Sequence, residues 1–142
     1  MHRLPQTTRA RQIALQILFA WDANASADEP IAQRIAVDAE PGNTQVQLRA
    51  IDIATGAWEY RAESESIADR LAPQWPTRRQ PAVDRNILRI GIWEMHHTQT
   101  PPKVVIDEAI ELAKSFSTEN SPGFVNAILD EVRKEREKLT QA

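Results

Sequence analysis

The sequence predicts an all-α protein, on three observations. Apolar residues recur at helical spacing along most of its 142 residues, no segment alternates as a strand does, and glycine occurs only four times. The pattern is densest over residues 83–130, where three apolar stripes follow one another with short connectors between them. Because such stripes must be buried against each other, we expect a bundle of about seven helices in two packed halves of three or four helices each.

The first two helices are predicted from an apolar stripe and its flanking turns. Thr7 or Thr8 can cap the first helix, because a threonine hydroxyl accepts a hydrogen bond from an N–H of the first turn. A loop at residues 24–26 and a turn at residues 41–42 leave room for a short second helix over residues 30–37. The stripe of the first helix is Ala10, Ala14, Ile17, Leu18 and Trp21.

A long third helix is predicted to begin at Thr44. Thr44 and Gln47 have the spacing of a capping box, in which each side chain reaches a backbone N–H near the other. No proline interrupts the chain before Pro73, so this helix can run for about seven to eight turns.

Three prolines between residues 73 and 81 mark a connector. We place there the seam between an N-terminal half, about residues 1–75, and a C-terminal half, about residues 76–142. Both halves are expected to belong to a single domain, residues 1–142.

Three helices are expected in the C-terminal half. Pro101 and Pro102 end one helix and open the next, because proline suits a first turn but not a helix interior. Ser121 is expected to cap the last helix, with Pro122 at its first position. The charged run at residues 133–138 is expected to fray into solvent. The stripe of the first of these helices contains Ile87, Leu88, Ile90, Gly91, Ile92 and Met95.

Composition narrows the class of protein. Hydrophobic residues at 42% and charged residues at 26% are ordinary for a globular protein. The chain has no cysteine, which excludes disulfides, thiolate catalysis and zinc–thiolate sites. No apolar run approaches the roughly 20 residues that a membrane span needs, and the N-terminus lacks the apolar core of a signal peptide. We therefore expect a cytoplasmic protein with no membrane partner.

The net charge of −3 is unevenly distributed. Residues 1–25 carry three arginines against one aspartate, and residues 73–105 carry five basic against two acidic side chains. Residues 26–72 are acidic, with nine acids against four bases. An acidic protein can still present a local basic face to phosphates, so the net charge lowers the expectation of an RNA partner without excluding it.

The residues do not predict catalytic chemistry. Glu94 and His97 form a Glu-x-x-His pair of the kind found in di-metal bundles, but a second such pair is missing, so polar residues at a helix end are the simpler interpretation. Asp107 and Glu111 lie one turn apart near a helix start, where the helix dipole and surface pairing account for them. We expect no enzyme, no metal site and no cofactor.

Two basic clusters are candidates for RNA contact. The first cluster is Arg3, Arg9 and Arg11, for which a solvated helix start is the alternative interpretation. The second is Arg78 and Arg79 near Trp75. Guanidinium groups can contact phosphates or stack on bases, and aromatic rings can stack on bases, although Trp75 can equally pack in the core.

Several motifs resemble the NusB family of bacterial transcription antitermination factors. They lie at residues 84–89, 106–114 and 124–130, in the order and with the separations of the family, and Arg9-Ala10-Arg11 follows its N-terminal pattern. The resemblance implies a NusB-like helical bundle of two subdomains without catalytic activity. It also implies binding of the boxA element of nascent ribosomal RNA leaders together with NusE, a small-subunit ribosomal protein, alongside other Nus factors and RNA polymerase.

The resemblance further implies which residues face RNA. The basic arm of the family falls on the first cluster, and a second RNA-facing segment falls on residues 118–124 with Lys114 nearby. A phosphate there would meet free N–H groups at a helix start. Phe124 remains open between core packing and base stacking. With the second cluster included, the expected RNA-binding residues are Arg3, Arg9, Arg11, Arg78, Arg79, Lys114, Asn120, Ser121 and Phe124.

The chain departs from the family pattern at both RNA-facing segments. Thr7 and Thr8 stand where relatives often have arginines, which would remove phosphate contacts. Asn120 stands where acidic residues are common, which favours RNA. Two alternatives stay open: a protein-interaction module or homodimer with weakened RNA binding, and a non-catalytic helper of an RNA-modifying enzyme.

Overall fold

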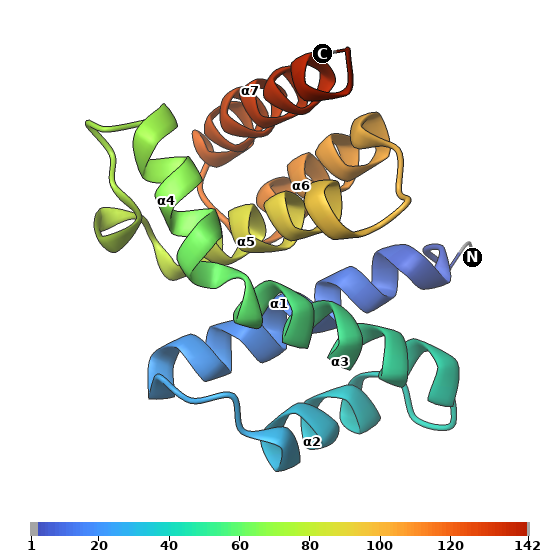
Figure 1. Ribbon diagram of the computed structural model, residues 1–142. Helices are drawn as coiled ribbons and strands as arrows, with labels where there is room; N and C mark the ends of the chain where they lie inside the picture. Colours follow the sequence, from blue (N-terminus) through green and yellow to red (C-terminus); the bar gives the residue numbers. More distant parts are fainter. Residues whose placement is uncertain (1–2, 142) are drawn as a thin grey trace. The chain divides into compact units, whose positions relative to one another are not determined.

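The computed structural model describes residues 3–141, and these form seven α-helices and one short 3₁₀ helix, with no strand in that range (Figure 1). The prediction of an all-α protein with about seven helices is confirmed. The helices are α1 (Gln6–Asn24), α2 (Glu29–Ala39), α3 (Thr44–Glu59), α4 (Arg61–Leu71), the 3₁₀ helix η1 (Thr77–Arg79), α5 (Ala82–His97), α6 (Pro102–Phe116) and α7 (Ser121–Gln141).

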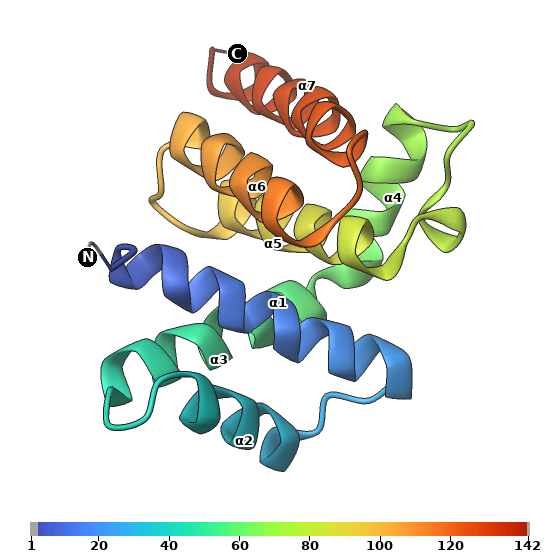
Figure 2. The same cartoon turned by 180° about the vertical axis from the view of Figure 1, so that it is seen from behind.

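The chain divides into two compact units between Glu59 and Tyr60, and the first unit contains α1, α2 and α3. Within it, α1 packs along α3, and α2 lies against both (Figure 2). Trp21 of α1 and Trp58 of α3 meet edge to face, with ring centroids 5.8 Å apart. Trp21 Nε1 also donates to the Asp28 carbonyl oxygen at 2.9 Å, so this ring ties the α1–α2 connector to the core.

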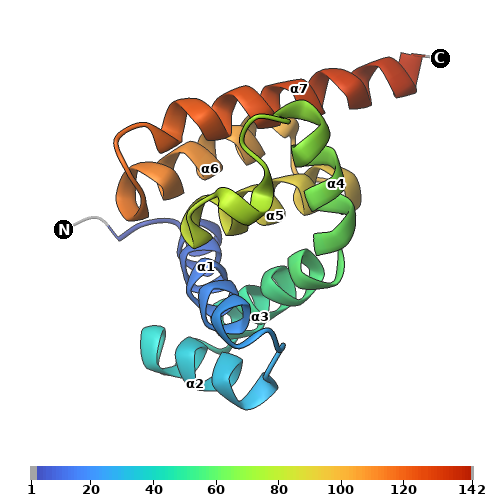
Figure 3. The same cartoon turned by 90° about the vertical axis from the view of Figure 1, so that its left-hand side faces the viewer.

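The second unit contains α4 to α7, and α5 is its central helix. α5 packs against α4, α6 and α7, while α6 and α7 lie side by side (Figure 3). The α5–α7 contact is close at Gly91, where an added Cβ would lie 2.9 Å from both methyl carbons of Leu129. The missing side chain at Gly91 therefore allows the two helices to approach.

The prediction of one long third helix is wrong, because α3 and α4 are separate helices that meet at Tyr60. The Tyr60 hydroxyl lies 3.1 Å from His96 Nδ1, and the Tyr60 ring lies edge to face against His97 with centroids 4.5 Å apart. These partners are more than 30 residues away in sequence, so local spacing could not reveal the contacts that Tyr60 makes.

The seam between the units also differs from the expected position. α4 packs against α5 and α7, so it belongs to the second unit, and the boundary falls before α4 rather than in the proline-rich connector. The organisation of both units as a single domain stays a prediction.

Two N-terminal caps differ from the predicted ones. α1 follows Pro5 and begins at Gln6, without a side-chain cap from a threonine. Asn43 caps α3, because its Oδ1 accepts from Val46 N at 3.2 Å, whereas Gln47 Nε2 donates to the Glu40 carbonyl oxygen at 2.7 Å. Both differences are shifts within about two residues of the helix ends, where sequence patterns are least decisive.

The second helix is confirmed and the expected fraying of the last helix is wrong. Asp28 caps α2, with its Oδ1 accepting from Ile31 N at 3.1 Å. α7 continues to Gln141, and along its surface Arg133 pairs with Asp130 at 2.7 Å and with Glu137 at 2.8 Å.

Replacing Gly91 with alanine should lower the free energy of unfolding by about 1–3 kcal/mol, because the new Cβ would overlap Leu129 in a filled core. Gly123→Ala is the matched control: a Cβ there meets nothing within 4 Å, so this change should be neutral or stabilising by up to about 1 kcal/mol. Urea titration followed by circular dichroism measures both. Equal stability of the two variants would contradict the close approach of α5 and α7.

Candidate nucleic-acid interface

Two connectors of the second unit come together around the start of α7. A pocket of about 280 Å³ lies there, between the α4–α5 connector and the α6–α7 turn. Among the residues that line it are Trp75, Asn120, Ser121 and Phe124, which we call the α7-start surface. Three of these are predicted RNA-binding residues, and Trp75 is the aromatic side chain that the sequence placed beside the second basic cluster.

Asp84 holds the α6–α7 turn against the first turn of α5. Its Oδ1 accepts a hydrogen bond from Ser117 Oγ, and its Oδ2 accepts from Ser121 Oγ at 2.9 Å. Ser121 Oγ also lies 2.8 Å from Thr118 Oγ1. Asp84 is only 4% exposed, so these hydroxyls satisfy a buried carboxylate and fix the backbone of the turn.

Ser121 is therefore placed differently from its prediction as a simple helix cap. Its side chain is buried and its hydroxyl is engaged with Asp84, while the residue itself is the first of α7. The Ser121 hydroxyl is thus committed to the protein interior, and any contribution it makes to binding comes from the shape it gives the turn.

The exposed part of the α7-start surface combines aromatic and amide groups. Trp75 is 42% exposed, Phe124 is half-buried and Asn120 is exposed. The Phe124 N–H donates to the Asn120 carbonyl oxygen at 3.4 Å. Pro122 has no N–H, so the Gly123 N–H is the one backbone donor between Ser121 and this bond. A Cβ at Gly123 would meet nothing within 4 Å, so this helix start is open to a ligand.

The second basic cluster lies next to Trp75 on η1. Arg78 and Arg79 are exposed, and within residues 3–141 neither forms an ion pair. η1 is held in place because Thr77 N and Thr77 Oγ1 both donate to Asp69 Oδ1 at 2.7 Å. The two guanidinium groups therefore extend from a fixed turn into solvent.

Lys114 lies near the C-terminal end of α6. Its side chain is 59% exposed, and its Nζ is 3.5 Å from Glu111 Oε1. An exposed pair at this distance contributes little, so the Lys114 ammonium can exchange Glu111 for another anion.

The predicted arginine arm belongs to the first unit, where Arg3 and Arg9 both contact Glu40. Arg9 Nη2 lies 2.7 Å from Glu40 Oε1, and Arg3 Nη2 lies 2.8 Å from Glu40 Oε2. We call these three residues the Glu40 cluster. The hydrogen bond from Arg9 holds the pKa of Glu40 below its usual value, and the charge of Arg3 lowers this pKa further. Burial acts in the opposite direction but does not outweigh them.

Arg11 differs from the expectation of a solvated helix start. It is 3% exposed and has an interaction partner of its own, so its guanidinium is not free in this structure. Its assignment as an RNA contact stays a prediction, and it is the least accessible member of the first cluster.

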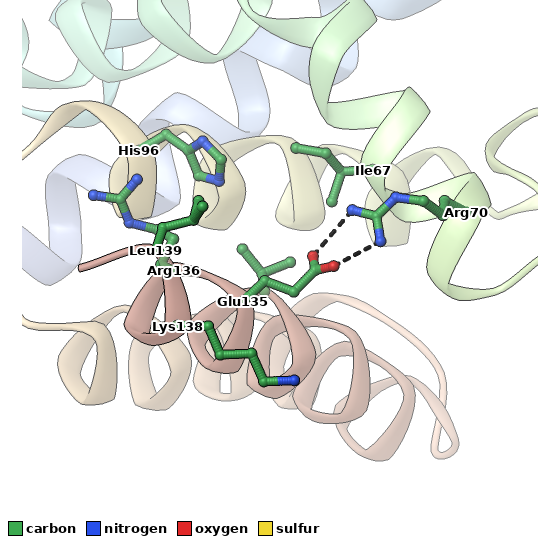
Figure 4. A pocket seen from close by; sticks show the side chains of 8 residues that line it. Ile67, Arg70, His96, Glu135, Arg136, Lys138 and Leu139 are labelled. Carbon is green, nitrogen blue, oxygen red and sulfur yellow. Dashed lines mark hydrogen bonds and ion pairs between the residues drawn. The ribbon is translucent and has the colours of Figure 1, made fainter. Parts of the chain in front are cut away.

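A groove in the second unit lies away from the α7-start surface, between α4, α5 and the C-terminal turns of α7 (Figure 4). It encloses about 430 Å³, and Ile67 and Leu139 are among the residues that line it. Arg70 and Glu135 pair across it at 2.6 Å. Burial, assisted by the charges of Arg136 and His97, lowers the pKa of His96 at its edge, so that imidazole is neutral at pH 7.

Two features of the site were missed by sequence analysis. Asp84 had a detectable signal, an acid in the first turn of an otherwise apolar helix, but nothing in the pattern named its serine partners. Glu40 had none, because Arg9 and Arg3 lie 31 and 37 residues away in sequence.

Within residues 3–141, no helix is long and apolar enough to cross a membrane. Nor do these residues bring together three or more His, Cys, Asp or Glu side chains in a geometry that could hold a metal ion.

The helices and this surface define a class, an all-α protein of two helical units with an aromatic surface at a helix start and two exposed arginines on the adjoining η1. The model of the NusB family matches residues 8–134, and the chain belongs to that family. The transcription antitermination protein NusB of Solibacter usitatus (strain Ellin6076) is 45% identical over 134 residues, which cover 89% of this chain and 88% of that protein. The same protein of Roseiflexus sp. (strain RS-1) is 41% identical over 128 residues, covering 87% and 89%.

Solved structures agree with this assignment. The NusB of T. maritima superposes with a TM-score of 0.80 at 31% identity, over 98% of this chain and 99% of that one. A chain from the crystal structure of the antitermination factors NusB and NusE in complex with double-stranded RNA gives a TM-score of 0.81 at 22% identity, over 94% and 99%, which shows the fold alone. The predicted resemblance is confirmed, and with it the expectation of a transcription antitermination factor rather than an enzyme.

Replacing Asp84 with alanine should lower the free energy of unfolding by about 2–3 kcal/mol, because Ser117 and Ser121 lose a buried acceptor. It should also speed hydrogen exchange of the amides in residues 117–124. The matched control is Asp107→Ala, since Asp107 is an exposed acid on α6. Unchanged exchange in the turn of the Asp84 variant would contradict the positioning of the α7 start by Asp84.

Proposed function

We propose that this chain binds boxA-type RNA as a transcription antitermination factor and does so together with NusE. Membership of the NusB family supports the proposal, as does the occurrence of NusB with NusE and double-stranded RNA in one crystal structure of the same fold. The other Nus factors and RNA polymerase are the further partners in the cytoplasm that the family resemblance implies.

The observation that carries the proposal is that aromatic and amide groups meet at the α7-start surface, with two exposed arginines on the adjoining 3₁₀ helix η1. Trp75 and Phe124 line one pocket that is large enough for a nucleobase, and stacking is worth about 1–3 kcal/mol per base. Arg78 and Arg79 extend from the adjacent turn and supply phosphate contacts. Asn120 offers amide donors and an acceptor at the rim, where a charged acid would repel phosphate.

The arrangement favours a single strand over a duplex. Bases of a single strand can be splayed out and stacked on aromatic side chains, whereas those of an A-form helix are hidden in a deep, narrow groove. The carboxylate of Asp84 also lines the pocket, which disfavours a phosphate inside it and leaves the phosphates to Arg78, Arg79 and Lys114 outside. Arg3, Arg9 and Arg11 would add contacts from the first unit.

Two kinds of substitution should affect RNA binding in different ways. Trp75→Ala should weaken the affinity for a boxA-like single strand by about 5- to 100-fold with little change in its salt dependence, because a stacking contact is lost. Arg78→Ala with Arg79→Ala should flatten the slope of log K against log salt by about 1.4, because two phosphate contacts are lost. Fluorescence anisotropy between about 50 and 200 mM salt, with and without NusE, measures both.

The matched control removes two exposed lysines of the same unit, Lys103→Ala with Lys138→Ala, at the opposite ends of α6 and α7. It changes the net charge as the double arginine variant does but should leave the slope nearly unchanged. An equal flattening of the salt slope in the double lysine variant would show that RNA binding depends on overall charge and not on Arg78 and Arg79. A wild-type protein that binds no RNA even with NusE, and that dimerises instead, would favour the interaction-module alternative.

A further inference from the structure

We propose that Glu40 limits RNA affinity by competing with phosphate for the guanidinium groups of Arg3 and Arg9. The proposal rests on the RNA-binding function proposed above and concerns how strongly the arginine arm contributes to it. Family resemblance places these arginines on RNA, whereas the structure places both of them on one buried carboxylate of the same unit.

Arg9 is the more completely occupied of the two arginines. Its Nε and Nη2 lie 3.2 and 2.7 Å from Glu40 Oε1, and its Nη1 donates to the Leu4 carbonyl oxygen at 2.7 Å. Its side chain is only 13% exposed. One edge of this planar group is therefore filled by a carboxylate in the geometry that a phosphate would use.

Arg3 is held less tightly and by a different oxygen. Its Nη2 donates to Glu40 Oε2 at 2.8 Å, while its side chain remains 67% exposed. An exposed guanidinium can exchange one anion for another at little cost. Arg3 is thus the member of the Glu40 cluster that a phosphate can reach first.

The backbone of Glu40 is held on both sides, which keeps its carboxylate close to the two arginines. It follows the last turn of α2, its N–H donates to the Ala36 carbonyl oxygen at 3.0 Å, and its own carbonyl oxygen accepts from Gln47 Nε2 at 2.7 Å. Its side chain is 5% exposed. A phosphate that reaches either arginine therefore approaches the negative charge of Glu40, and the two positive charges of the cluster count as about one.

The position of Glu40 shows whether it competes with phosphate for the two arginines or merely orients them for RNA. A carboxylate that merely oriented the arginines would contact a part of each guanidinium that RNA does not need. Glu40 instead takes the Nε–Nη2 edge of Arg9 and the terminal nitrogen of Arg3, which are donors for bidentate and end-on phosphate contacts. Removing its charge should free those donors.

Glu40→Gln tests this directly. We expect the affinity for a boxA-like single strand to rise about 3- to 10-fold near 0.1 M salt, with a salt slope steeper by up to about 0.7, because one more phosphate contact forms. Adding Arg3→Ala and Arg9→Ala to Glu40→Gln should abolish the gain. The matched control is Glu29→Gln, which removes one exposed negative charge from the same helix and should change the affinity less than 2-fold.

Three results would overturn the proposal: weaker binding by Glu40→Gln, a gain equal to that of Glu29→Gln, or a gain that survives loss of both arginines. Should Glu40→Gln fail to fold, as a thermal melt would reveal, Glu40→Asp replaces it, because the shorter side chain keeps the charge but draws the carboxylate back from Arg3 and Arg9. That variant should bind the same strand more tightly than the wild type does, and an equal or lower affinity contradicts competition.

Failure of the proposed function is distinguishable from failure of this inference. If the wild-type protein binds no RNA, the proposed function is wrong as stated. If Glu40→Gln then gains RNA binding that depends on Arg3 and Arg9, the competition proposal is still supported. If neither form binds, the competition proposal falls as well. If the wild type binds and Glu40→Gln binds no better, only the competition proposal is lost.

Discussion

The buried carboxylate of Asp84 is the interaction on which the candidate site depends. It joins the first turn of α5 to the turn before α7 through Ser117 and Ser121, and so sets where α7 begins. Asn120 and Phe124 are placed by that start, opposite Trp75 across one pocket. Without this carboxylate the turn before α7 would lose the hydrogen bonds that join it to α5.

The first unit also contains a buried carboxylate, but its effect on RNA binding is expected to be different. Glu40 is also a buried carboxylate at the end of a secondary-structure element, but its partners are arginines rather than hydroxyls. Asp84 therefore orders a neutral surface on which bases can stack, whereas Glu40 neutralises charge that phosphates need. Affinity in this chain would then rest more on the α7-start surface and on Arg78 and Arg79 than on the N-terminal arm.

Sequence patterns predicted what depends on local spacing. The stripes of α5, α6 and α7 and the prolines between them were sufficient to place three helices, because apolar spacing and proline geometry act within one or two turns. The contacts of Tyr60 and the pairing of Glu40 could not be predicted, since their partners lie more than 30 residues away. Ser121 was correctly placed at a helix start, but its hydroxyl, expected to accept from a backbone N–H, donates to Asp84 Oδ2 instead.

The central claim is that RNA binds at the α7 start, and the most direct measurement is backbone amide chemical-shift mapping of the labelled protein as a boxA-like single strand is added. We predict the largest shifts at residues 75–79 and 118–124, with smaller shifts at residues 3–9, where Glu40 competes. Shifts confined to the groove of Ile67, His96 and Leu139, or spread evenly over exposed basic residues, would contradict the claim.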